Sequence, residues 1–342
     1  MKPTKSQHFE KTLSKNSKFK SDLFFSIIIF FIMIFIISNP KVFSAATISG
    51  LNLFINSVMP GLFPFMFLTK LLTEIGYIFL LSKHFNKFSN KLFGTPGISF
   101  YAFLMSILSG YPIGAKIISD LYLMGAISQK DAQKISIFCT TSGPIFVIGA
   151  VGVGMLENYK VGLILYFSHI FSSILMGVLY NLLTKEKSTI SLNKTIINIE
   201  KKENIFSNCI VETINSIFIV GAYITIFYLI SELLINLKII NSLTNILSLV
   251  LSPINISKIE YEGFLFGLIE VTRGCKILSQ SSSFLAIATS CGLISFSGIS
   301  IILQSMAFLK NTQIKMHRFI FSKLVHMTLS IFLCYLGLTI FM

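Results

Sequence analysis

Apolar runs of about 20 residues, separated by short basic segments, recur along nearly the whole chain. A run of this length matches the thickness of a bilayer core, where only helices or closed barrels satisfy every backbone hydrogen bond. The runs lack the strict alternation of apolar and polar residues that barrel strands require. Only 12% of the 342 residues are charged and the mean hydropathy is +0.78, whereas soluble chains carry about 25% charged residues. The sequence therefore predicts an all-α integral membrane protein whose first partner is the lipid bilayer.

The net charge of +14 does not indicate nucleic-acid binding, because the 28 Lys and Arg residues lie between the apolar runs and not on one soluble face. The five cysteines are far apart and show neither a disulfide framework nor metal-ligand spacing. The sequence contains no phosphate-binding loop, nucleophile elbow, zincin helix or paired catalytic carboxylates. We therefore expect no enzyme activity, catalytic residue, cofactor or metal site.

The chain divides into a basic cytoplasmic tail (1–20), an N-terminal transmembrane helix (21–40), two related units (45–183 and 205–342) and a polar linker (184–204). The basic start and apolar middle of the first 46 residues also fit a cleaved signal peptide, although we expect a retained helix. Four short matches recur in the same order in the two units. They are Ile55-Asn56-Ser57 with Ile214-Asn215-Ser216, Gly114-Ala115-Lys116 with Gly274-Cys275-Lys276, Ser142-Gly143 with Cys291-Gly292, and His169 with His326.

Each unit is expected to contain a long helix, a short helical hairpin, a helix interrupted by glycine and a final helix. The first of these elements is expected at 50–81, with a kink at Pro60 and Pro64. The arm 98–108 is too short to span a bilayer, so each hairpin is expected to be re-entrant and each unit to cross three times. The chain would then have about seven spanning helices and two inverted-topology repeats with broken helices. In this topology, with the N-terminus inside, 20 Lys and Arg residues lie in cytoplasmic segments and four in outside loops, as the positive-inside rule requires.

The first hairpin turn combines a broken backbone with a cation at membrane depth, because Lys116 follows the turn Ser109-Gly110-Tyr111-Pro112. Half-helices of this kind direct their dipoles at ions or polar solutes. The alternative is a structural turn whose lysine reaches the membrane surface.

In the second hairpin, Glu270 and Arg273 lie three residues apart and are expected to pair on one helix face. The pair is either structural or contains a carboxylate that responds to a proton or cation during transport.

The interrupted helices carry hydroxyl groups that could bind a polar solute or only cap the break. The expected solute-binding residues are Ser109, Tyr111, Lys116, Thr140, Thr141, Ser142, Glu270, Thr272, Arg273 and Ser290. The expected structural breaks are Gly110, Pro112, Gly114, Gly143, Pro144, Gly274 and Gly292.

The segments SGYPIGAK, TTSGPIFVIGAVGVGM and EGFLFGLIEVTRG resemble the sporulation integral membrane protein YlbJ family, whose members contain nucleoside-recognition Gate repeats. The likeness extends from about residue 45 to the end of the chain. It implies a membrane protein needed for spore cortex formation, located in the mother-cell or outer forespore membrane. The Gate repeat also resembles parts of concentrative nucleoside transporters and ferrous iron transporters. This likeness does not by itself identify a nucleoside as the solute.

These features together favour a secondary permease of an unidentified small solute, with a proton or sodium ion as the coupling ion. The alternative is a non-transporting membrane scaffold for a cortex-assembly complex. The sequence leaves the solute, the transport direction and the existence of a homo-oligomer open.

Overall fold

The computed structural model describes residue 23 and residues 26–184, 204–250 and 256–342. Every regular element in these ranges is a helix, which confirms the all-α prediction. Four helices are long and apolar enough to cross a membrane, and up to six spans result if each of two sharply bent pairs counts as one. About seven were expected, and the difference arises because breaks divide several of the expected long helices. The expected tail (1–20) and nearly all of the linker (184–204) lie outside the described residues.

The first half contains one long interrupted helix, a surface helix, a pair of short helices, a broken helix and a closing helix. In order these are α2 (Pro40–Leu53), the π-helix η1 (Phe54–Val58), α3 (Met59–Glu74), α4 (Tyr77–Phe93), α5 (Ile98–Ser109), α6 (Ile113–Leu123), α7 (Gln129–Phe138), the π-helix η2 (Ile145–Met155) and α8 (Tyr159–Thr184).

The second half has the same order of elements. They are α9 (Ile205–Asn236), α10 (Ile239–Val250), α11 (Lys258–Ile269), α12 (Val271–Leu278), α13 (Phe284–Phe296), α14 (Gly298–Leu309), the 3-10 turn η5 (Lys310–Thr312) and α15 (Met316–Phe341). The helices that begin the two short pairs, α5 and α11, both have 12 residues. The closing helices α8 and α15 both have 26 residues.

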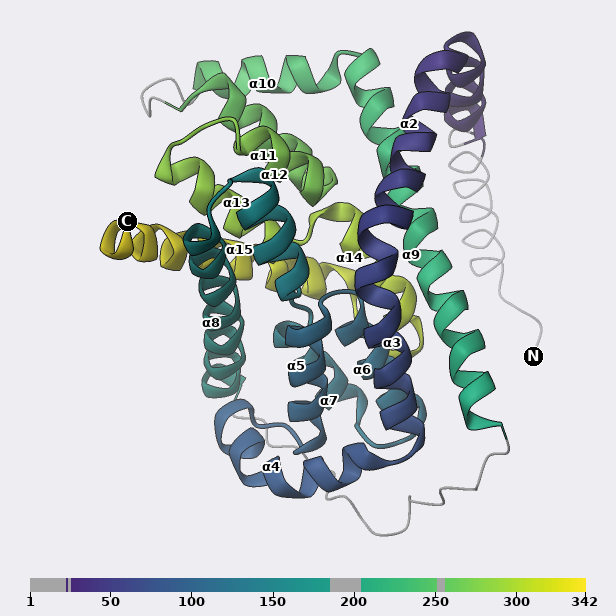
Figure 1. Cartoon of the computed structure of the whole chain (residues 1–342), viewed down its shortest axis with the longest axis vertical. Coiled ribbons are helices and arrows are strands. Elements are labelled where there is room, and N and C mark those ends of the chain that lie inside the picture. The colour runs from purple at the N-terminus through teal and green to yellow at the C-terminus, as the bar shows by residue number, and fades with distance from the viewer. Residues whose placement is uncertain (1–22, 24–25, 185–203, 251–255) are drawn as a thin grey trace, which may run out of the picture.

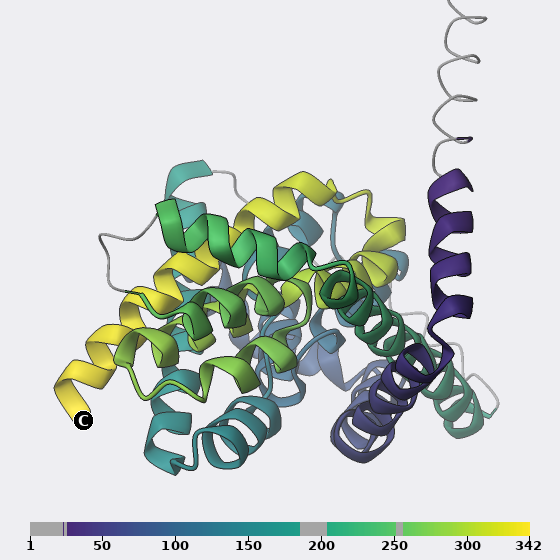
Figure 2. The same cartoon turned by 90° about the horizontal axis from the view of Figure 1, so that it is seen from above.

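The first long element differs from the expected helix at both ends. Helix Ser26–Ser38 meets the helix that starts at Pro40 at an angle of 100°, and it projects away from the other helices (Figure 2). The π-helical turn η1 ends directly before Met59 and Pro60, where proline cannot donate a backbone hydrogen bond. The element then ends at Glu74, not residue 81, because Gly76 adopts a φ of +81° and turns the chain into α4.

The two halves run in opposite directions at their first helices, which pack against each other. Figure 1 shows α2 and α3 descending beside α9, which ascends, and the three are in contact. Helix α4 then lies across the lower end of the molecule and α10 across the upper end (Figure 1). The amphipathic surface helix of each half therefore follows its long helix at opposite ends of the molecule.

An aromatic cluster fixes the lower end of the first half. The Phe93 and Phe138 rings stack with centroids 4.2 Å apart, and Phe103 contacts both edge-on at 5.8 and 5.6 Å. These residues come from α4, α5 and α7, so the stack joins the surface helix to the elements that carry the first hairpin turn. Aromatic pairs add about 0.5–1.5 kcal/mol each beyond the burial of their area.

Candidate functional site

The turn of the first hairpin packs backbone against backbone on the break between α7 and η2. Gly110 adopts a φ of +81°, and a Cβ at this position would lie 2.5 Å from the backbone nitrogen of Gly143. Gly114 lies inside α6, and a Cβ there would lie 1.7 Å from the carbonyl oxygen of Cys139. The glycines therefore allow the hairpin turn and the helix break to touch, which places Ser109 and Tyr111 beside Ser142.

Side chains from both halves satisfy the backbone groups that this break leaves free. The Ser106 hydroxyl accepts the Thr141 N–H at 3.0 Å and bonds the Thr141 hydroxyl at 2.8 Å. The buried Lys323 of α15 donates to the Thr140 carbonyl. Lys323 is one of the lysines counted above in the cytoplasmic segments, but it is buried and binds a carbonyl just beyond the C-terminal end of α7.

The turn of the second hairpin is built on Glu270. This buried residue is extended between α11 and α12, and its carboxylate accepts the N–H groups of Thr272 at 3.0 Å and Arg273 at 2.8 Å. It is therefore the N-cap of α12 and satisfies two amides that would otherwise be unpaired. Because the carboxylate is held by backbone amides, the expected side-chain pair with Arg273 does not form. The Arg273 guanidinium instead lies 3.6 Å from the Glu232 carboxylate on α9.

The break in the second half lies later than expected. Helix α13 runs unbroken through Ser290 and Gly292, and the chain turns at Ser297 and Gly298, which have φ values of +79° and +65°. Gly292 packs on Ile331 of α15. It therefore allows the two helices to approach closely and does not break α13. Gly274 is likewise inside α12, where it packs on the backbone of Gly267.

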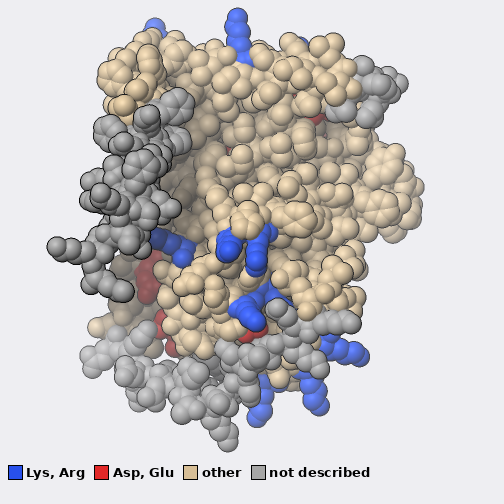
Figure 3. Space-filling model, turned by 180° about the vertical axis from the view of Figure 1, so that it is seen from behind, with Lys and Arg blue, Asp and Glu red and all other residues tan. Residues whose placement is uncertain are grey.

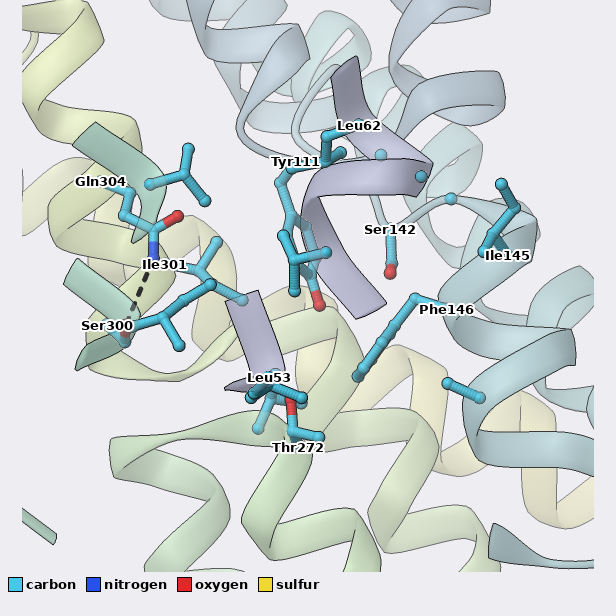
Figure 4. Close-up of a pocket in the computed structure, with 18 of the residues that line it drawn as sticks. Leu53, Leu62, Tyr111, Ser142, Ile145, Phe146, Thr272, Ser300, Ile301 and Gln304 are labelled. Atoms are coloured by element: carbon cyan, nitrogen blue, oxygen red, sulfur yellow. Dashed lines mark hydrogen bonds between the residues drawn. The ribbon is translucent and has the colours of Figure 1, made fainter. Parts of the chain in front are cut away.

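A central cavity of about 220 Å³ lies between the two hairpin turns. The first half contributes Ser109, Tyr111 and Ser142, and the second half contributes Glu270 and Thr272. Most of the remaining wall is apolar. It consists of residues from the first long helices and the broken helices, among them Leu53, Leu62, Ile145, Phe146, Val220, Ile224 and Ile301. Figure 4 shows the Tyr111 and Ser142 hydroxyl groups pointing into the space between these walls.

Three buried hydroxyl groups in this cavity have no hydrogen-bond partner in the part of the chain that the structure describes. They belong to Ser109, Tyr111 and Ser142; the last two lie close enough to interact with each other without forming a hydrogen bond of standard geometry. A buried polar group without a partner costs about 1–3 kcal/mol, so such groups normally bind water or a ligand. Their convergence gives this cavity three hydroxyl groups that can bind water or a ligand.

Five of the expected binding residues lie outside the cavity lining. Thr140, Thr141 and Ser290 are buried within helix contacts, Arg273 pairs with Glu232, and Lys116 faces a different cluster. The lining includes instead Gln304, whose side-chain amide donates to the Ser300 hydroxyl at 3.3 Å (Figure 4). A lone glutamine within the apolar helix Gly298–Leu309 is the sequence signal that would have identified it.

A second cluster, which we call the ion-pair cluster, joins α3, α6 and α9. The Lys70 ammonium lies 3.0 Å from the Glu74 carboxylate, 2.8 Å from that of Glu212 and 3.9 Å from that of Asp120. Lys116 lies 2.7 Å from Asp120. Helices α3 and α9 also line the central cavity, through Leu62 and Val220 among others, and the turn that precedes α6 contributes Tyr111. The i,i+4 spacing of Lys116 and Asp120 was available in the sequence, but their approach to Lys70 was not.

The two histidines stack on each other where α8 crosses α15, with ring centroids 4.9 Å apart. The Ser142 N–H donates to Nε2 of His169 at 2.8 Å, so Nδ1 of this ring carries the proton and donates to the Ser295 hydroxyl at 2.7 Å. Ser295 donates in turn to Ser330 at 2.6 Å. His169 is therefore a positioning residue that ties the Ser142 backbone to the second half of the molecule.

No group of three or more His, Cys, Asp or Glu side chains in the described ranges is placed to hold a metal ion. The five cysteines are free and buried. The polar groups of the cavity thus offer hydrogen bonds and one carboxylate to a ligand.

The chain is similar to the sporulation integral membrane protein YlbJ of Bacillus subtilis (strain 168). The two are 26% identical over 311 residues, which cover 85% of this chain and 76% of the relative. No protein-family model and no solved structure matches the chain.

Proposed function

Since the chain belongs to the YlbJ family of sporulation integral membrane proteins, we propose that it is a secondary permease that moves a small polar solute across a membrane of the sporulating cell. Residues 45–183 and 205–342 are then two inverted repeats, each contributing one hairpin turn to a shared solute site. The membrane is the mother-cell plasma membrane or the outer forespore membrane, with the N-terminus in the cytoplasm. The solute enters the central cavity and binds Ser109, Tyr111, Ser142, Glu270 and Gln304.

The observation that carries this proposal is the convergence of unpartnered hydroxyl groups on a cavity between the two hairpin turns. A scaffold has no need for unpartnered hydroxyl groups in a central cavity, because each one lowers the stability of the fold. A transporter needs such groups, because they replace the water that its solute leaves behind. Broken helices that meet between inverted halves are the usual construction of solute sites in secondary transporters.

The ion-pair cluster supports a route for alternating access. It joins α3, α6 and α9, of which α3 and α9 also line the cavity and α6 directly follows the first hairpin turn. Ion pairs in low dielectric are weak net contributors to stability but strongly favour one arrangement of their helices over another. We propose that these ion pairs form when the cavity is closed on the side where the ion-pair cluster lies. They separate when the cavity opens to that side. A proton or sodium ion that binds Glu270 would couple transport to an ion gradient.

The test replaces Glu270 by Gln in sporulating cells in which this chain is the sole copy. The amide oxygen of Gln can accept only one of the two N–H groups, from Thr272 and Arg273, that the two carboxylate oxygens accept separately. Membrane abundance is therefore measured alongside, and spore counts are compared at equal abundance. We expect the number of heat-resistant spores to fall by at least tenfold, because the charge at the cavity is lost. Glu262→Gln, which changes a carboxylate on α11 outside the cavity lining, is the matched control.

Unchanged spore counts in Glu270→Gln would contradict the role of Glu270 as the charged group of the site.

A solute screen then identifies the ligand. Purified protein is heated with nucleosides, nucleobases, cell-wall precursors or metal ions, and the midpoint of unfolding is measured. A permease predicts stabilisation by one class that is lost in Tyr111→Phe and Ser142→Ala. A scaffold predicts no stabilisation by any class, with function lost instead on removing residues 2–20.

A further inference from the structure

A long groove lies on the outer surface between α7, α8 and the first turns of α15, well away from the central cavity. Its volume is about 790 Å³. Its walls are mainly apolar and include Ile137, Met176, Leu179, Leu183, Phe319 and Val325. Leu183 and Phe321 at its margin are 83% and 67% exposed. In a membrane protein such side chains face acyl chains, so the groove is open to the bilayer and not to an internal path.

One end of the groove is basic. His317 and Arg318 line it, and both are exposed at the start of α15. Lys315 directly precedes them as the N-cap residue of α15 and is also exposed. Figure 3 shows the face seen from behind, where most of the visible Lys and Arg side chains gather in the middle and lower part and a few project from the upper edge.

No carboxylate of the described chain neutralises this end. Arg318 and Lys315 form no ion pair with any residue that the structure places. The sequence holds no Asp or Glu after Glu270. Asp131, on the neighbouring helix α7, is buried and engaged with the N–H and hydroxyl of Ser128 in a capping box. Among the residues that the structure describes, the basic end therefore has no anionic partner.

We propose that this groove binds an anionic phospholipid of the surrounding bilayer, with its phosphate against Arg318 and Lys315 and an acyl chain along Met176, Leu179 and Val325. The arrangement fits both parts of such a lipid. The guanidinium group of Arg318 can donate two parallel hydrogen bonds to the phosphate, and the apolar wall can pack against an acyl chain. Basic pockets between transmembrane helices commonly bind acidic headgroups. The lipid would hold α7 and α8 of the first half against α15 of the second half.

The test measures the thermal stability of the purified full chain in detergent with added phosphatidylglycerol, or with phosphatidylcholine of the same acyl chains. We expect phosphatidylglycerol to raise the midpoint of unfolding in a saturable way and phosphatidylcholine to have little effect. Arg318→Gln and Lys315→Gln should each weaken the apparent affinity about fivefold, since each removes one basic charge near a membrane surface. Lys160→Gln, an exposed lysine at the start of α8, is the matched control and should change nothing.

A second variant tests the apolar wall without changing charge. Leu179→Trp narrows the groove, and we expect weaker phosphatidylglycerol binding with the unfolding temperature in detergent alone unchanged. The proposal is overturned if the two lipids stabilise equally, if glycerol phosphate without acyl chains stabilises as well as the lipid, or if Arg318→Gln and Lys160→Gln behave alike. It is also overturned if no lipid binds and Arg318→Gln dissociates a dimer, because a second copy of the chain would then occupy the groove.

Discussion

At the scale of single residues, the site depends on which polar groups are satisfied and which are left free. Within the described ranges, the hydroxyls of Ser109, Tyr111 and Ser142 form no hydrogen bond of standard geometry, whereas the Ser142 N–H donates to His169. The sequence predicted the hydroxyls, because they flank glycine and proline at helix breaks. It did not predict the role of His169, since a single histidine in an apolar helix carries no sign of a partner 27 residues away.

Replacing His169 by Ala should destabilise the protein through the Ser142 N–H, which would lose its acceptor in a buried position. We expect a loss of about 1–3 kcal/mol from the unpaired group, with a further loss from the cavity that the ring leaves. Thermal unfolding of the purified protein measures it. His84→Ala, at an exposed position on α4, should leave the midpoint within about 1 °C of wild type. Equal behaviour of the two variants would mean that His169 does not position the break.

At the scale of elements, the short hairpins and breaks decide the architecture. The turns at 109–112 and the break at 139–144 were predictable from glycine and proline, which end helices for local steric reasons. The second break was not, because Ser297 adopts a left-handed conformation without a proline beside it. Nor could local sequence show that Gly274 and Gly292 serve helix contact, because that depends on the neighbours Gly267 and Ile331.

Gly110→Ala tests the contact between hairpin turn and helix break. A methyl group there would meet the Gly143 backbone nitrogen at 2.5 Å on a residue whose φ is +81°. The conformation alone, with a ψ of −178°, costs about 1–3 kcal/mol for a residue with a Cβ, and the clash adds to it. We expect a clearly lower unfolding temperature and loss of function. Gly149→Ala in η2, where a Cβ would have no neighbour within 4 Å, should retain both; similar losses in the two variants would contradict the close packing of the turn.

At the scale of the whole molecule, two halves with the same order of helices enclose a central cavity, whose mainly apolar wall carries a few polar groups, and are joined by charged and hydrogen-bonded contacts. The four short sequence matches predicted a duplication, and the lysine distribution predicted its direction in the membrane. The assembly of Lys70, Asp120 and Glu212 from three helices was beyond the sequence, since ion pairs between distant segments depend on how the helices pack.

In the ion-pair cluster, Lys70 of α3 and Glu212 of α9 should act through their contact with each other. Lys70→Glu leaves four carboxylates in the cluster with Lys116 as its lysine. We therefore expect the cavity to stay open on the side of the cluster and function to be lost. Adding Glu212→Lys should restore a large part of the function, because the pair then forms with reversed charges. Spore counts and membrane abundance measure this, and no recovery in the double variant would mean that the two residues do not act through each other.

The central claim is that the cavity opens alternately to the two sides of the membrane. Leu62→Cys places a thiol in the wall of the cavity, in a chain whose native cysteines are all buried. Its labelling by a membrane-impermeant maleimide is measured in right-side-out and inside-out vesicles, with Lys160→Cys as a marker for one side. The account predicts labelling of Leu62→Cys from both sides and of Lys160→Cys from one. Labelling of Leu62→Cys from one side only, or from neither, would contradict transport and favour a membrane scaffold.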